Sequence, residues 1–246
     1  MKTNIIDWSK NSWNPISGCT KISTGCKNCY AYRIALELQK QGKPKYKNGF
    51  KTTCHPSLLR EPFKWKESKR IFVNSMSDLF HKDVPDSFIM RVFWTMSLAA
   101  QHQFYALTKR SERLYSMRNE LSWMDNIWMG VSVETADFLY RVDHLRATGA
   151  YIKFLSIEPL LGPISDIDLT DINWVIVGGE SGPGARPIKK EWVIDIRDQC
   201  VAAGVPFFFK QWGGKNRKKH GCLLEGKKWD QMPEIRIPGQ DLLMCV

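Results

Sequence analysis

The hydrophobic positions of the chain form short, nearly continuous apolar runs that alternate with segments of helical spacing. The apolar runs are rich in β-branched and aromatic residues, which predicts strands at residues 70–80, 103–110, 127–134, 151–159, 173–181 and 205–214. The segments with apolar residues three or four apart predict helices at residues 83–101, 111–121, 135–149 and 189–204. Continuous apolar strands alternating with helices are typical of a parallel sheet with helices outside it.

One less regular unit precedes these, with a strand at residues 11–19 and a helix at residues 29–42. The link at residues 160–172 is too short and too rich in turn residues for a full helix. Helix caps and stops are expected at Asp86 or Ser87, Thr135, Gly42, Gly149 and Gly204.

Polar side chains end each predicted strand: Asp78, Lys109, Glu134, Glu158, Glu180 and Lys210. In a (β/α) barrel the carboxyl ends of all strands face one mouth, where a site is assembled from many strand ends. We therefore predict an α/β fold with a partial or complete TIM-like barrel of about six or seven parallel strands. A doubly wound open sheet is the alternative, but no dinucleotide-type glycine motif opens the first helix.

The strand–helix rhythm stops near residue 212. We predict a barrel domain at residues 1–212 and a basic carboxyl-terminal extension at residues 213–246, irregular or hairpin in form, with a turn at "LLEGKKW".

Positive charge dominates the chain, with a formal net charge of +11 over 246 residues. Lysine and arginine are dense at residues 40–70 and 209–229, where aromatic residues and glycines are interleaved. This combination suits a phosphate backbone and stacked bases, which predicts a nucleic acid or nucleotide partner. The alternative is an ordinary solvated surface. The sequence does not indicate how many chains assemble.

The sequence has neither an apolar run of the ~18 residues that span a bilayer nor an apolar signal core at its start. We therefore expect a cytoplasmic protein without a membrane partner. In that reducing compartment its seven cysteines are expected to hold metal or perform chemistry rather than form disulfides.

Three cysteines, Cys19, Cys26 and Cys29, form a C-x6-C-x2-C pattern in a loop before the first helix. The positive helix end is expected to lower their pKa values and favour metal ligation. One interpretation is a structural zinc site, with a fourth ligand from Cys54, His55, His81 or Cys222. A second is an iron–sulfur cluster closed by four cysteines. A third is a [4Fe–4S] cluster with three cysteine ligands and one iron open to S-adenosylmethionine (SAM).

The three-cysteine loop on a parallel barrel resembles the radical SAM superfamily, although the commonest spacing there is C-x3-C-x2-C. A closer resemblance is carried by "WNPISGCTKISTGCKNCYA", "MSDLFH", "SVE", "EPLLGPI", "GGESGPGARP" and "FFKQWGG". Together these motifs resemble a phage- and prophage-associated family of unassigned function with a radical-SAM-like cysteine motif. That family is distantly similar to radical SAM enzymes of the spore photoproduct lyase type.

The resemblance implies roles for the strand ends. The methionyl amine of SAM would meet Ser75, Ser77 and Asp78, its carboxylate Lys109 or Arg110, and its ribose Ser132 and Glu134. The residues remaining for substrate are Glu158, Glu180, Lys210 and Gln211, of which Glu158, Glu180 and Lys210 are the catalytic candidates. Each also has a structural interpretation, such as capping a turn or ending a strand.

The resemblance thus implies a radical SAM enzyme supplied by an external electron donor, with a [4Fe–4S] cluster on Cys19, Cys26 and Cys29. It would form a 5′-deoxyadenosyl radical that abstracts hydrogen from a nucleic acid or nucleotide, in repair or modification. One alternative is a non-catalytic nucleic-acid-binding protein with a structural zinc or closed iron–sulfur site. Another is a partner protein that kept the barrel and lost the chemistry.

Overall fold

The computed structural model describes residues 11–215 and 221–234 of the chain. At its centre is a seven-stranded parallel sheet in the order β1-β4-β5-β6-β7-β8-β9. These strands are β1 (Asn11–Trp13), β4 (Arg70–Val73), β5 (Gln103–Thr108), β6 (Ile127–Ser132), β7 (Ile152–Ile157), β8 (Trp174–Gly178) and β9 (Phe207–Gln211). The prediction of about six or seven parallel strands is confirmed.

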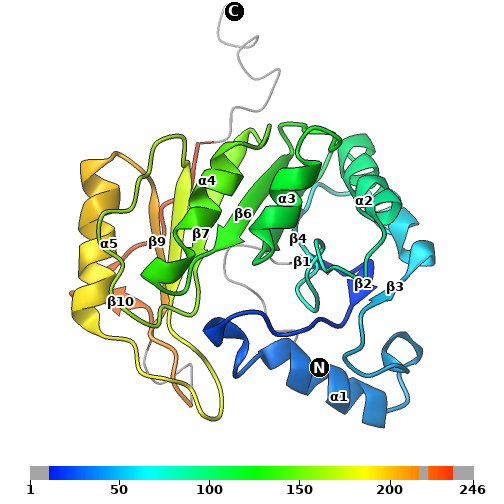
Figure 1. Cartoon of the computed structure of the whole chain (residues 1–246), viewed down its shortest axis with the longest axis horizontal. Coiled ribbons are helices and arrows are strands. Elements are labelled where there is room, and N and C mark those ends of the chain that lie inside the picture. The colour runs from blue at the N-terminus through cyan, green and yellow to red at the C-terminus, as the bar shows by residue number, and fades with distance from the viewer. Residues whose placement is uncertain (1–10, 216–220, 235–246) are drawn as a thin grey trace, which may run out of the picture.

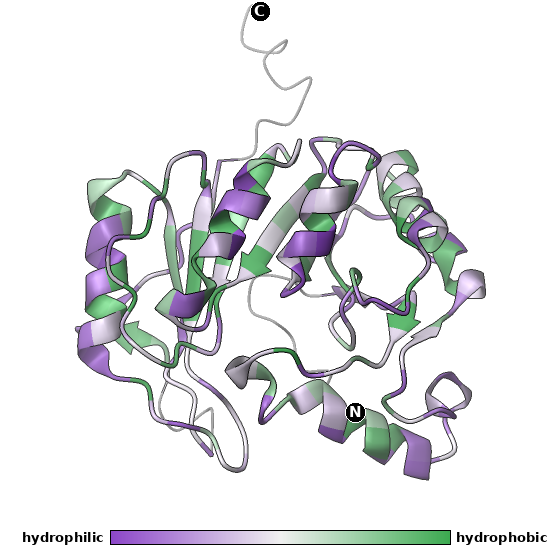
Figure 2. Cartoon of the chain, in the orientation of Figure 1, coloured by the Kyte–Doolittle hydropathy of each residue, from purple (hydrophilic) through white to green (hydrophobic). Residues whose placement is uncertain are grey.

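Helices follow most of these strands, as the apolar spacing predicted. They are α1 (Tyr30–Lys40), α2 (Asp86–Leu98), α3 (Ser111–Met117), α4 (Tyr140–Arg146) and α5 (Lys190–Ala202). The main core joins α2, α3, α4 and α5 to one face of the sheet through buried residues such as Phe93, Leu114, Leu145 and Ile196. Figure 2 shows green, hydrophobic strands behind α3 and α4, whose outward turns carry purple, hydrophilic residues.

The opposite face of the sheet forms a separate aromatic core of Phe72, Tyr105, Trp128, Phe154, Trp174 and Phe208. The strand register sets these side chains on one face, because Phe72 pairs with Tyr105 and Tyr105 with Trp128. Helices on one face and packed aromatics on the other are the arrangement of a (β/α) barrel rather than a doubly wound sheet. Since β1 and β9 are the two edges of the sheet, the barrel is partial.

Several predicted boundaries are wrong. The strand at residues 70–80 ends at Val73, and the strand at residues 11–19 splits into β1 and β2 (Ile16–Ser17). β2 leaves the main sheet and pairs antiparallel with β3 (Thr53–Cys54). The helix at residues 135–149 is a 3₁₀ turn (Ala136–Phe138) followed by α4, and ends before Ala147, not at Gly149.

Two caps also need correction or qualification. Pro85 rather than Asp86 or Ser87 precedes the first turn of α2. Thr135 does precede the 3₁₀ turn, although its side chain makes no capping hydrogen bond there. Gly42 and Gly204 follow α1 and α5 with φ angles of 68° and 66°, which allow the left-handed conformation that ends a helix.

Short 3₁₀ helices and a hairpin complete the described chain. The 3₁₀ helices include Thr24–Cys26, Pro44–Tyr46, Pro56–Arg60 and Pro62–Lys64. The predicted turn at "LLEGKKW" is confirmed, and it joins the hairpin of β10 (Leu223–Leu224) and β11 (Lys227–Lys228). Trp229 and Gln231 then exchange backbone hydrogen bonds with Phe209 and Phe207 at the β9 edge. The proposed domain division stays a prediction, since residues 216–220 and 235–246 lie outside the described part.

α1 and the loop before it lie apart from the outer helices, near the end of the sheet toward which the strands point (Figure 1). Among the helices of the described residues, none is long and apolar enough to cross a membrane.

Candidate functional site

The carboxyl ends of the strands converge on one mouth, as the sequence predicted. Side chains alternate between the two faces of a strand, so residues two apart share a face. Lys109 therefore lies on the same, inner face of the sheet as Tyr105. Lys210 lies on the same face as Phe208. Glu134 and Glu158 stand at the same level beyond β6 and β7. The aromatic core of the inner face is therefore the floor beneath these charged side chains.

Glu134 is the centre of the charged cluster, and its side chain is fully buried. Its carboxylate lies 2.7 Å from Lys109 Nζ and 2.9 Å from Arg141 Nη1, while Ser23 Oγ donates a hydrogen bond of 2.6 Å. Burial alone would raise the pKa of Glu134, but Lys109, with support from Ser23 and Arg141, holds that pKa below its ordinary value. Glu134 is therefore a charged carboxylate inside the protein.

A second ion pair lies beside this cluster. Lys210 Nζ is 2.5 Å from Glu158 Oε2, and each side chain is 14% exposed. Lys109 Nζ connects the two groups, because it also lies 3.4 Å from the backbone oxygen of Glu158. Four of the predicted site residues thus form one continuous network.

The cysteine loop, residues 19–29, is held across this mouth by three polar side chains that lie between its cysteines. Ser23 contacts Glu134 beyond β6. Asn28 Nδ2 donates to Glu180 beyond β8 at 3.0 Å, and to the Gly184 backbone oxygen at 2.8 Å. Thr20 contacts His81 and Arg110, which follow β4 and β5. The loop is therefore fixed to ends of the sheet that are far apart in sequence.

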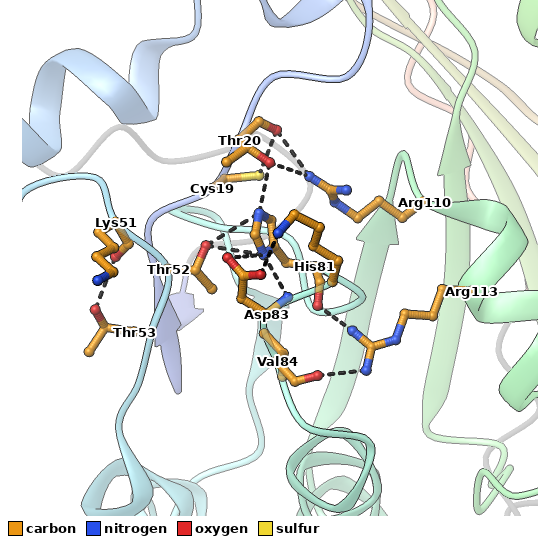
Figure 3. A network of polar contacts seen from close by, with 11 residues as sticks. Cys19, Thr20, Lys51, Thr52, Thr53, His81, Asp83, Val84, Arg110 and Arg113 are labelled. Atoms are coloured by element: carbon orange, nitrogen blue, oxygen red, sulfur yellow. Dashed lines mark hydrogen bonds and ion pairs between the residues drawn. The ribbon is translucent and has the colours of Figure 1, made fainter.

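His81 fixes Thr20 of the cysteine loop, as Figure 3 shows. Its Nδ1 accepts the backbone N–H of Asp83 at 3.1 Å, which leaves Nε2–H to donate to Thr20 Oγ1 at 2.8 Å. Burial, together with the charge of Arg110, lowers the pKa of His81, in agreement with a neutral ring. Arg110 Nη2 donates to the same Thr20 oxygen at 2.9 Å.

Gly25 explains part of the wide gap between Cys19 and Cys26. A Cβ at residue 25 would lie 2.4 Å from Glu134 Oε1, so only glycine allows the loop to approach the carboxylate this closely. Within the six residues between the first two cysteines, Thr20 contacts His81, while Ser23 and Gly25 lie against Glu134.

The three thiols of the loop are free and half-buried. The prediction that the loop lowers their pKa values is wrong for Cys19, because burial, with Asp78 nearby, raises the pKa of its thiol to about 12. α1 begins at Tyr30, and Cys29, not Cys19, is the residue directly before it. A metal at Cys19 would therefore have to displace a proton.

The donor chemistry of the loop fits an iron–sulfur cluster, since three reduced thiols lie on one segment at the mouth. Cys26 is close enough to Cys19 to influence its pKa. Within residues 11–215 and 221–234, however, no three cysteine, histidine or acidic side chains gather closely enough to hold a metal ion. The fit is therefore one of residue type and location rather than of a preformed ligand set.

Three of the four candidates for the fourth zinc ligand have contacts of their own. His55 Nε2 lies 2.8 Å from Ser17 Oγ, His81 holds Thr20, and Cys54 packs against the main core from β3. Cys222 precedes β10 and is half-buried.

The residues predicted to hold SAM contact the protein itself. Asp78 accepts hydrogen bonds from Thr108 Oγ1 at 2.7 Å and from the backbone N–H groups of Phe80 and Lys109. Ser75 Oγ donates to Asn14 Oδ1, and Ser77 Oγ donates to the Ile16 backbone oxygen. The Ser132 hydroxyl is buried at the end of β6. Their roles toward SAM stay predictions.

The sequence analysis missed four residues that organise the site: Thr20, Ser23, Asn28 and Arg141. Thr20, Ser23 and Asn28 lie within the cysteine motif. Their polar side chains at these positions could have identified them as contacts of the loop. Arg141 is only 1% exposed although it is charged, and it donates to Glu134 and the Ser132 backbone oxygen. Its position beside Val142 and Leu145, on the apolar side of its helix, could have identified Arg141 as a buried charge.

The hydrogen bond from Asn28 to Glu180, which follows β8, is expected to depend on pH. Burial raises the pKa of Glu180, but hydrogen bonds from Arg186 outweigh it and hold that pKa below the ordinary value. A carboxylate with a lowered folded pKa stabilises the fold above its unfolded pKa of about 4.3, and this stabilisation is lost as pH falls through the folded pKa.

In urea unfolding, the stability difference between wild type and Glu180→Gln should therefore be constant between about pH 7 and 5, and narrow below about pH 4.3. A difference that is unchanged at pH 3, or that widens there, would contradict this assignment.

The comparisons with known proteins give one family and one structural likeness. A family model described as "Protein of unknown function (DUF5131)" matches residues 3–233. No curated protein sequence matches the chain. Among solved structures, a spore photoproduct lyase variant with bound AdoMet and dinucleoside spore photoproduct is similar, with a TM-score of 0.45 and 11% identity over 69% of this chain.

The match spans 56% of the lyase chain, little more than half of its length. A likeness at this level carries no argument about activity. Neither match concerns phage, so that part of the resemblance stays a prediction.

Proposed function

The chain belongs to the family described as a protein of unknown function (DUF5131), and we propose that it is a radical SAM-type enzyme that acts by hydrogen abstraction on a nucleic acid or nucleotide. One observation carries the proposal: a loop with three free cysteines is tied across the mouth of a partial parallel barrel. Its ties to His81, Glu134 and Glu180 hold it over the charged strand ends.

In this proposal Cys19, Cys26 and Cys29 hold a [4Fe–4S] cluster, and three protein ligands leave one iron for SAM. When bound and reduced by an external donor, such a cluster supplies the electron that cleaves SAM to methionine and a 5′-deoxyadenosyl radical, which takes a hydrogen atom from substrate. The protein's part is to bind and orient the reactants and to exclude water from them.

The strand-end residues supply that orientation. Ser75, Ser77 and Asp78 are the candidates for the methionyl amine, and Lys109 or Arg110 for its carboxylate. Ser132 and Glu134 are the candidates for the ribose hydroxyls. The buried aromatic face beneath them excludes water from the reacting groups.

Glu158, Glu180 and Lys210 are the candidates that face substrate. The ion pair of Glu158 with Lys210 holds both side chains in fixed positions. A polar substrate group could exchange with either partner, which would orient it toward the cysteine loop.

Anaerobic reconstitution with iron and sulfide tests the proposal. The expected result is a brown protein that absorbs near ~400 nm and forms 5′-deoxyadenosine from SAM after reduction with dithionite. The product is quantified by chromatography, with and without DNA, RNA or nucleotides. Colourless protein with one zinc per chain would instead support a non-catalytic nucleic-acid-binding protein. A cluster without 5′-deoxyadenosine under any of these conditions would refute SAM cleavage.

A further inference from the structure

The segment at residues 19–51, here called the basic lobe, carries a concentrated positive charge. It holds the cysteine loop, α1 and the turn that follows α1. Eight lysines and arginines against a single acid, Glu37, give it a net charge of +7 of the chain's +11. The cations are Lys21, Lys27, Arg33, Lys40, Lys43, Lys45, Lys47 and Lys51, and all except Lys45 are exposed.

These charges are not neutralised within the protein. In the described residues, none of the eight lies in an ion pair, whereas some cations elsewhere on the surface have acidic partners. Lys82 pairs with Asp83, Arg113 with Asp86 and Lys190 with Glu225. A surface that keeps its charges unpaired over so short a segment attracts a polyanion.

Aromatic side chains are interleaved with these cations along one flank of α1. Tyr32 is 43% exposed, and its ring meets Phe50 edge-on at 5.4 Å between centroids. Lys21 Nζ lies 5.8 Å from the Tyr32 ring centroid. Gln39 lies two turns further along α1, and its Nε2 donates a hydrogen bond to the backbone oxygen of Lys47. The flank therefore presents an exposed aromatic ring with cations at both ends.

This flank leads directly to the cysteine loop. The backbone N–H of Cys19 donates to the Phe50 oxygen at 3.1 Å, which places Lys51 beside Cys19 in the chain packing. A polymer bound along Lys47, Tyr32 and Lys21 would thus reach the mouth of the barrel.

We propose that the basic lobe binds single-stranded nucleic acid, with Tyr32 stacking on a base and Lys21, Lys47 and Lys51 contacting phosphates. Unpaired bases expose the faces that an aromatic ring can stack on, whereas a duplex buries them. The inference rests on the proposed function for the identity of the substrate, but binding to the lobe requires neither the cluster nor SAM.

Fluorescence anisotropy with a labelled single strand of about 20 nucleotides tests this proposal. The logarithm of wild-type affinity should fall linearly with the logarithm of salt concentration, by about 0.7 per phosphate contact for single strands. The double variant Lys21→Glu/Lys51→Glu should bind at least tenfold more weakly at low salt and show a shallower slope. Tyr32→Ala should lose about tenfold, since one stacked base contributes that order of affinity, while Tyr32→Phe keeps it.

Two surface variants are matched controls that should bind as wild type does: Lys190→Glu on α5 and Tyr151→Ala before β7, where the tyrosine is 59% exposed. Circular dichroism checks that every variant is folded. Unchanged binding by the Lys21→Glu/Lys51→Glu and Tyr32→Ala variants would overturn the proposal. Equal affinity for duplex DNA or for an oligoglutamate would also overturn it.

The outcome is separable from that of the proposed function. Oligonucleotide binding that depends on Tyr32, without any formation of 5′-deoxyadenosine, would support the binding role of the basic lobe and refute the proposed enzyme activity. Formation of 5′-deoxyadenosine by a protein that binds no oligonucleotide would support the proposed enzyme activity and refute the binding role of the basic lobe.

Discussion

Replacing Cys26 with alanine is expected to abolish both the cluster and the formation of 5′-deoxyadenosine. In the proposed site every thiol of the loop is a ligand, and only three are available. Iron and sulfide content after anaerobic reconstitution should fall to background, and the absorbance near ~400 nm should disappear. Cys19→Ala and Cys29→Ala should behave in the same way.

Cys54→Ala and Cys222→Ala are the matched controls for this series. Both thiols are free and half-buried, as those of the loop are, but they lie on β3 and before β10. Both variants should keep the cluster and the activity. Loss of metal in Cys54→Ala or Cys222→Ala would show a fourth protein ligand and would favour a closed cluster or zinc.

Replacing Glu134 with alanine is expected to cause the largest loss of stability at the site, about 3–5 kcal/mol. The substitution leaves the Arg141 guanidinium, which is 1% exposed, without its carboxylate partner. Breaking one side of a buried ion pair is costly because the other charge stays buried and unpaired. Ser23 of the cysteine loop also loses its acceptor. Urea unfolding at pH 7 measures the change.

Two further variants identify the cause of this loss. Glu225→Ala removes a carboxylate that also contacts two cations, Lys190 and Arg197, but is 44% exposed, so it should cost far less stability than Glu134→Ala. Glu134→Leu combined with Arg141→Met should recover much of the loss, since neither charge is then buried alone. A cost below 1 kcal/mol for Glu134→Ala would mean that water reaches this cluster.

The sheet and the location of the site were predictable because their signals are local. Apolar strand bodies such as "NWVIVGG" identify a strand buried on both faces, and the polar residue after each strand marks the mouth. This reasoning located Lys109, Glu134, Glu158 and Lys210, which the structure joins in one network.

The rest depends on contacts between distant segments, which periodicity does not contain. The helix predicted at residues 135–149 is shortened around Arg141, whose side chain turns inward to Glu134 and lies 4.0 Å over the Phe138 ring. The strand at residues 70–80 ends at Val73, and the residues after it lead to His81, which holds Thr20 of the cysteine loop. Tertiary partners therefore decided these boundaries.

The order in which the chain is synthesised matters for the cysteine loop. Its three fixing contacts join residues that are 61, 111 and 152 positions apart, the last between Asn28 and Glu180. At roughly 5–20 residues per second, Glu180 leaves the ribosome about 8–30 s after Asn28. Throughout that interval the thiols are on a nascent chain without the partners that later fix them. We therefore expect cluster assembly to follow completion of the sheet.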